Sequence, residues 1–214
     1  YFKKPNIRII ENPFQYTRRR KLPINKKFIY FEKINEIKNI DLIIKAFIAS
    51  KPSSEWSLEL YGIQDDKKYF NYLENIIEKS GYSKQIFFKK PIFSEEKYKI
   101  ISSAWCNVLI SKSEILSLSV LESLSVGTPS MVNKDIYFPN WIKKTIFLSK
   151  NNILNLKQSF KSIMKMKLSS RKYIGDKIIQ NFDENYSNTS IKKRYIDYIK
   201  TISKDISFTN YEIK

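Results

Sequence analysis

The stretch "FIYFEKINEIKNIDLIIKAF", residues 28–47, decides the fold because it changes from the pattern of a strand to the pattern of a helix. It begins with a short run of aromatic and β-branched side chains, which is typical of a buried strand. After a polar loop, apolar side chains recur at helical spacing, and Asp41 stands near the expected helix start, where an acidic side chain is favourable. A buried strand joined to an amphipathic helix is the first half of a βαβ unit.

The same alternation continues on both sides of this stretch. Strands rich in apolar residues that alternate with helices indicate a parallel sheet with right-handed crossovers. The sequence therefore predicts an α/β fold, a Rossmann-like doubly wound parallel sheet of about six strands with helices on both faces. The expected strands are residues 28–31, 58–62, 86–88, 106–110, 130–132 and 145–148, with a further short strand at 7–10. The first expected helix follows the loop at residue 39 and includes residues 40–47. The other expected helices cover residues 66–79, 95–103, 118–126, 152–165, 170–182 and 190–203.

The composition excludes several kinds of site. The chain has no histidine, so histidine-based triads and the usual zinc sites are excluded. Cys106 is the single cysteine, which rules out an internal disulfide framework and indicates a reduced compartment. No run of about 18 apolar residues occurs, so we expect no membrane span, and the first residues do not resemble a signal peptide.

The formal net charge of +18 allows a second class of function. A basic chain could bind nucleic acid or an anionic membrane surface. Most of the positive charge is lysine, however, and most of these lysines should lie on solvated helix faces. We therefore expect no specific nucleic-acid partner and keep peripheral contact with a membrane as an expectation.

The stretch "SEILSLSVLESLSVGTPSMV", residues 113–132, brings candidate binding groups to the edge of the sheet where ligands bind. Ser117 is a good N-cap, and the unpaired N–H groups of the following helix could hold a phosphate. Glu114 and Glu122 flank that position, and carboxylates accept hydrogen bonds from vicinal diols. A nucleoside diphosphate sugar has this layout. Alternatively, Ser119 and Glu122 form a local capping box and Glu114 is a solvated loop residue.

Taken with the order of the elements, Glu114, Leu118-Ser119-Val120-Leu121-Glu122 and Gly127-Thr128-Pro129 resemble the E-x7-E signature of the family 4, or group 1, retaining glycosyltransferases. These are GT-B enzymes with two Rossmann-like domains. The resemblance implies that Glu122 holds the donor ribose and that Glu114 is the catalytic carboxylate at the donor sugar. It also implies that Ser117 and Leu118 lend backbone N–H groups. Lys33 and Lys38 stand where the family binds the donor diphosphate, and no metal is implied.

The chain departs from the family pattern at several positions. Ile115-Leu116-Ser117 replaces the usual Gly-Phe-Gly, which affects how closely the backbone can approach a phosphate. Glu32 stands where the family has a glycine before its basic pair, and Asn39 where it has one after. Lys33 offers a point charge in place of the bidentate fork of an arginine.

The resemblance also implies a division of the chain. We expect residues 1–27 to be an interdomain connection with the first strand, 28–182 the nucleotide-sugar-binding domain, and 183–214 a C-terminal helix that packs on an N-terminal acceptor domain not contained in this sequence. The donor would be a UDP-, GDP- or ADP-type sugar, without other cofactors, and the parent enzyme would make a bacterial polysaccharide or glycolipid. We expect a cytoplasmic chain, peripheral at the inner face of the membrane, that is inactive alone. The alternatives are a catalytically silent nucleotide-sugar-binding or scaffold module and a basic protein that binds nucleic acid or a membrane surface.

Overall fold

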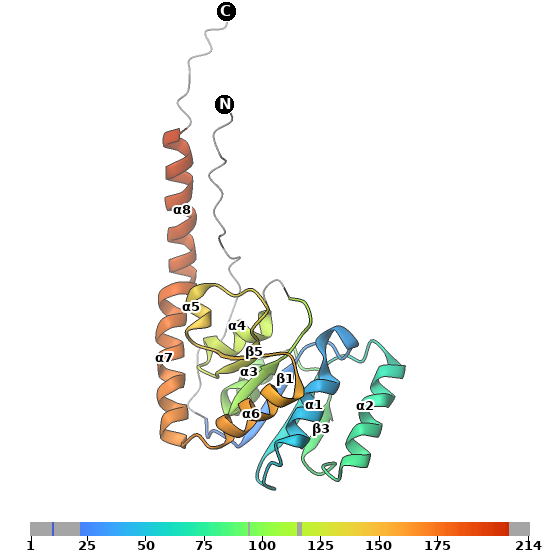
Figure 1. Cartoon of the computed structure of the whole chain (residues 1–214). Helices are drawn as coiled ribbons and strands as arrows, with labels where there is room; N and C mark the ends of the chain where they lie inside the picture. The colour runs from blue at the N-terminus through green and yellow to red at the C-terminus, as the bar shows by residue number, and fades with distance from the viewer. Residues whose placement is uncertain (1–9, 11–21, 94, 115–116, 206–214) are drawn as a thin grey trace, which may run out of the picture.

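A six-stranded parallel sheet forms the centre of the chain (Figure 1). The computed structural model describes residues 10, 22–93, 95–114 and 117–205. Within them the strand order is β3-β2-β1-β4-β5-β6. The strands are β1 (Lys27–Phe31), β2 (Ser57–Tyr61), β3 (Ile86–Lys89), β4 (Cys106–Leu109), β5 (Ser130–Asn133) and β6 (Phe147–Ser149).

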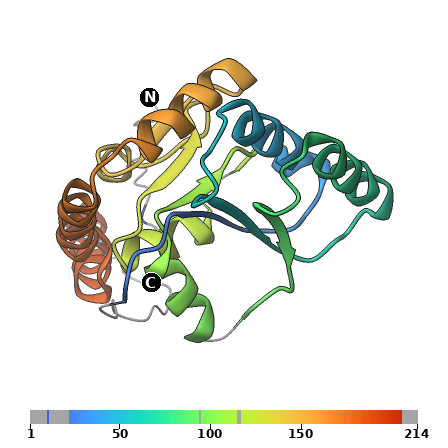
Figure 2. The same ribbon diagram turned by 90° about the horizontal axis from the view of Figure 1, so that it is seen from below.

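Helices cover both faces of the sheet (Figure 2). On one face α1 packs against α2 and α6, and on the other α4 packs against α3 and α7. This arrangement confirms the doubly wound fold that the sequence predicts. The helices are α1 (Ile40–Ala49), α2 (Lys67–Ser80), α3 (Glu95–Ser103), α4 (Leu118–Ser125), α5 (Asn140–Lys143), α6 (Ile153–Met164), α7 (Leu168–Tyr186) and α8 (Asn188–Asp205), with a 3-10 turn η1 (Glu36–Lys38).

The alternation of side chains along β1 explains why both faces of the sheet are covered. Phe28 points to the face of α1 and α6, where its ring meets Phe47 and Phe160 at centroid distances of 6.1 and 4.8 Å. Ile29 and Phe31 belong to a second apolar cluster on the other face. A strand that is buried on both faces has a continuous run of apolar residues in its sequence, and β1 has such a run.

The end of the chain differs from the expectation. The helix expected at residues 170–182 continues as α7 to Tyr186, because Phe182 and Tyr186 both pack against Trp141, at 6.0 and 5.7 Å between ring centroids. The expected domain boundary at residue 182 therefore falls inside a helix. α8 then leads away from the sheet (Figure 1). The strand expected at residues 7–10 lies outside the described residues except for Ile10, which is irregular.

The strand order also shows where a ligand site is expected. β1 lies between β2 and β4, so the connections leave β1 and β4 in opposite directions. In open parallel sheets the crevice beyond the carboxyl ends of such a strand pair is the usual ligand site. Among the described residues, no helix is both long and apolar enough to cross a bilayer.

Candidate functional site

The loops that follow β1 and β4 meet at the crevice. The amide of Lys112 donates to the carbonyl of Ile37 at 2.8 Å, and Ser111 Oγ donates to the same carbonyl at 3.2 Å. In the first loop, Asn35 caps η1 by accepting from the amide of Lys38 at 3.2 Å. The turn ends at Asn39, which is in the left-handed region with φ of 59°. These bonds hold the Lys38 loop against the Glu114 loop.

Lys38 is the centre of a partly buried cluster of charges. Its Nζ forms an ion pair with Glu114 and lies 3.4 Å from Glu32 Oε2. The side chains of Lys38, Glu32 and Glu114 are 15, 21 and 12% exposed. One lysine therefore faces two carboxylates, which leaves the cluster with one excess negative charge. The structure brings together two of the residues singled out from the sequence, Lys38 and Glu114, and adds Glu32.

Ser117 connects this cluster to the start of α4. Its hydroxyl accepts from the amide of Val120 at 3.4 Å, as an N-cap does, and donates to Glu32 Oε1 at 3.0 Å. The carboxylate of Glu32 thus spans Lys38 and the N-terminus of α4. The backbone of Glu32 lies close to Gly62, where a Cβ atom would stand 2.0 Å from the Glu32 carbonyl oxygen. Only a glycine at position 62 leaves room for this loop.

Glu122 lies one turn further along α4 and has a different partner. Lys97 Nζ of α3 lies 2.6 Å from Glu122 Oε2, and it also stands 5.4 Å from the centre of the Phe31 ring. The ion pair does not have hydrogen-bond geometry, and this buried oxygen has no hydrogen bond among the described residues. Burial raises the pKa of the nearby Tyr98 to about 12, and the charge of Glu122 adds to that rise.

A cavity of about 280 Å³ opens beside Glu122. Its walls are largely apolar, and Phe31 and Tyr61 stack there with ring centroids 4.4 Å apart. Phe93 is 81% exposed at this cavity. The residues around the cavity are Phe31, Glu32, Lys33, Tyr61, Gly62, Ile63, Pro91, Ile92, Phe93, Lys97, Leu118, Ser119 and Glu122. Polar groups on one side and flat apolar groups on the other would suit a ligand that has both a ring and hydroxyls.

The structure places the six residues singled out from the sequence at the same edge of the sheet. Lys33, Leu118 and Glu122 line the cavity, while Lys38, Glu114 and Ser117 form the adjoining cluster. Lys33 is exposed and pairs with Asp65 at 3.0 Å. The contributions of Glu32 and Lys97 were not predicted. The position of Glu32 directly after β1 could have indicated its contribution. No local sequence pattern indicated that Lys97 would contact Glu122.

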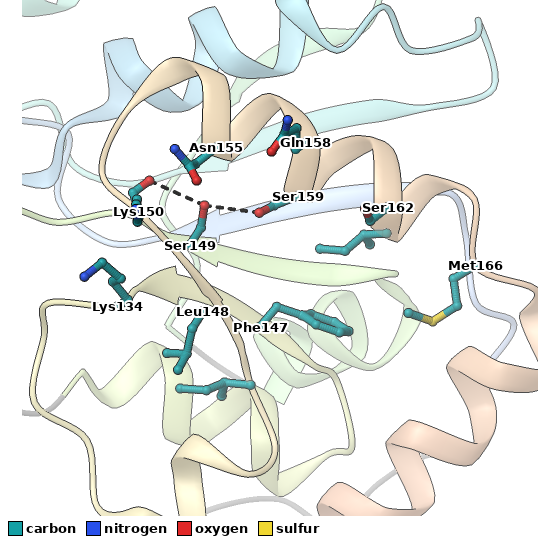
Figure 3. Close-up of a pocket in the computed structure, with 12 residues that line it drawn as sticks. Lys134, Phe147, Leu148, Ser149, Lys150, Asn155, Gln158, Ser159, Ser162 and Met166 are labelled. Carbon is teal, nitrogen blue, oxygen red and sulfur yellow. Dashed lines mark hydrogen bonds between the residues drawn. The ribbon is translucent and has the colours of Figure 1, made fainter.

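A larger hollow, of about 620 Å³, lies between β6 and α6 (Figure 3). None of the six residues singled out from the sequence lines it. Two of its serines are linked, because Ser159 Oγ donates to Ser149 Oγ at 3.1 Å, and Ser149 Oγ donates to the carbonyl of Lys150 at 3.4 Å. In the described part of the chain, no three acidic or cysteine side chains converge that could hold a metal ion.

Comparison with known proteins gives a consistent result. The family model for group 1 glycosyl transferases matches residues 15–180. The chain resembles a mutant of S. aureus TarM solved with fondaparinux, alpha-GlcNAc-glycerol and UDP, with a TM-score of 0.75, 22% identity and coverage of 92% of this chain and 40% of that one. The chain also resembles the pneumococcal O-GlcNAc transferase GtfA, solved with UDP and GlcNAc. The TM-score is 0.70 at 18% identity, with coverage of 89% of this chain and 38% of that one.

A third similar structure is the C-terminal domain of the group 1 glycosyl transferase LpcC from Francisella tularensis. Its TM-score is 0.69 at 20% identity, with coverage of 78% of this chain and 89% of that one. A search of curated proteins found no match. The chain thus spans about two fifths of the length of TarM and GtfA and most of the LpcC domain.

Proposed function

The chain belongs to the group 1 glycosyl transferases, and on this premise we propose that it is the nucleotide-sugar-binding part of a glycosyltransferase. The observation that carries the proposal is the partly buried Glu122 carboxylate beside an apolar cavity at the sheet's ligand edge. Glu122 Oε2 pairs with Lys97 Nζ at 2.6 Å, and a ribose hydroxyl could add a charge-assisted hydrogen bond to the same carboxylate. The stacked rings of Phe31 and Tyr61 would adjoin the nucleoside.

The diphosphate would lie next to this cavity, between Lys38 and the start of α4. Lysines and helix N-terminal amides stabilise negative charge as it develops on a leaving diphosphate, which requires no metal. Lys33 is exposed at the rim and could reach a phosphate by leaving Asp65. Glu114, on the far side of Lys38, would then face the donor sugar.

The finer features of the parent reaction follow from the family resemblance. We propose transfer with retention of anomeric configuration to an acceptor in bacterial polysaccharide or glycolipid synthesis, with an N-terminal domain supplying the acceptor site. NMR analysis of the product anomer formed by a two-domain parent enzyme tests the retention. A product of inverted configuration would contradict it.

A second candidate is a donor-binding module without catalysis. The pairing of Lys38 with two carboxylates favours it, because that lysine is already neutralised. The two candidates differ in turnover and not in donor binding. A two-domain parent that binds donor but releases no sugar, to water or to acceptor, would favour the second.

Calorimetry with nucleoside diphosphates tests donor binding on this chain. TarM and GtfA were solved with UDP, so UDP is the first ligand to test, followed by GDP and ADP. Glu122→Gln should weaken binding of the preferred nucleotide by about 1–3 kcal/mol, because it removes charge-assisted bonds to the ribose. Glu78→Gln, an exposed position on α2, is the matched control. Equal affinities for wild type and Glu122→Gln would contradict the assignment.

A further inference from the structure

We propose that Glu32 acts as a built-in counter-anion that restrains diphosphate binding in this site. The inference rests on the proposed function, because it concerns the position assigned to the donor diphosphate. It starts from where the Glu32 carboxylate lies. One oxygen accepts from Ser117 Oγ at 3.0 Å, and the other lies 3.4 Å from Lys38 Nζ. An anion bound between Lys38 and the start of α4 would use these same two groups.

The charge balance leads to the same conclusion. Lys38 already pairs with Glu114, so Glu32 adds a second carboxylate to a cation that one carboxylate neutralises. The cluster is therefore negative before any ligand arrives. A diphosphate is strongly anionic, and like charges repel more in a partly buried site than in water. Diphosphate binding must either displace the Glu32 carboxylate or tolerate its charge.

The fold keeps Glu32 in this position. Its carbonyl lies against Gly62, and its amide donates to the carbonyl of Tyr61 at 3.3 Å. The backbone at the end of β1 is therefore held, whereas the side chain, 21% exposed, can rotate away. Displacement of the side chain is thus a local event that needs no change in the sheet. Glu32 sets how strongly the site holds a diphosphate and so how readily it releases one.

Binding of inorganic pyrophosphate tests this inference without a nucleoside. Glu32→Gln keeps the size and the hydrogen bond to Ser117 but removes the charge, so pyrophosphate affinity should rise about tenfold. Glu36→Gln is the matched control, since Glu36 is exposed in the same loop and forms no ion pair with the described residues. Its affinity should stay within about twofold of wild type. Glu32→Ala provides a second variant in case the glutamine variant folds poorly.

Two results would overturn the inference. The first is that neither Glu32 variant gains more pyrophosphate affinity than Glu36→Gln does. The second is that the gain in pyrophosphate affinity persists in the double variant Glu32→Gln/Lys38→Gln. Pyrophosphate would then bind without Lys38 and therefore at another site. Uridine, which has no phosphate, separates this inference from the proposed function. If Glu122→Gln leaves uridine binding unchanged, the nucleoside assignment fails whatever pyrophosphate does.

Discussion

At the scale of single residues, the electrostatics of the candidate site are set by two lysines that face three carboxylates. Lys38 faces Glu32 and Glu114, and Lys97 faces Glu122. Each of these side chains is partly buried, so each pair depends on its partner more than a solvated surface pair does. The chain carries many lysines, and the ones that the structure places at this site are Lys33, Lys38 and Lys97.

Removal of Lys38 should destabilise the fold. Lys38→Gln leaves Glu32 and Glu114 close together without a cation, and we expect a loss of about 1–3 kcal/mol in the free energy of unfolding by urea. Lys33→Gln, which removes an exposed charge from the same loop, should cost less than about 1 kcal/mol. Adding Glu32→Gln to Lys38→Gln should recover part of the loss. Strictly additive effects of the two substitutions would show that they are not coupled.

At the scale of elements, the packing of α7 against α4 depends on two glycines and one arginine. Gly127, with φ of 74°, ends the turn after α4, and its carbonyl oxygen would lie 2.6 Å from a Cβ at Gly175 of α7. Arg171 is buried and donates to the carbonyls of Ala104, Trp105 and Gly127 at 3.0, 2.6 and 3.0 Å. These contacts fix the end of α4 and therefore the direction in which its N-terminus points.

Alanine substitutions should separate close packing from backbone conformation. Gly175→Ala places a methyl group against the Gly127 backbone, so we expect a loss of about 2–3 kcal/mol in thermal or urea unfolding. Gly81, with φ of 77° at the end of α2, has nothing within 4 Å of an added Cβ. Gly81→Ala should therefore cost only about 1 kcal/mol. A Gly175→Ala variant as stable as Gly81→Ala would mean that α7 can shift without cost.

The elements and the site differ in how far the sequence could predict them. Strands such as residues 28–31 were recognisable because apolar runs and helical spacing are local signals. The partners of the charged residues were not, since Ser117 meets Glu32 85 positions away and Arg171 meets the Gly127 carbonyl 44 positions away. The extension of α7 to Tyr186 was also missed, because it depends on the packing of Tyr186 against Trp141. Local patterns contain no information about such contacts.

At the scale of the whole molecule, Cys106 provides a probe of global stability. It is the chain's single cysteine, it lies fully buried in β4 at the centre of the sheet, and burial raises the pKa of its thiol to about 12. Because the unfolded chain loses the thiol proton near pH ~8.5, the protonated thiol does not oppose folding at neutral pH. Above that pH the unfolded state ionises while the folded state does not, so stability falls as the pH rises toward 12.

A thiol reagent should therefore react with Cys106 only when the domain unfolds. In native buffer at about pH 8 we expect slow modification, and urea should accelerate it in parallel with the loss of tryptophan fluorescence. Complete reaction within the mixing time, with the fold intact, would contradict the burial of this strand.

The most direct test of the central claim is a map of where UDP binds, by amide chemical shifts of the isotope-labelled chain. If the donor site lies at the carboxyl ends of β1 and β4, UDP should shift the amides of Gly62, Ser119 and Glu122. Amides lining the hollow between β6 and α6, such as Ser149, Gln158 and Ser159, should stay unchanged. Glu122→Gln should weaken the response, and Glu78→Gln should leave it intact. Shifts confined to the β6–α6 hollow, or none near Glu122 at saturating UDP, would contradict the account.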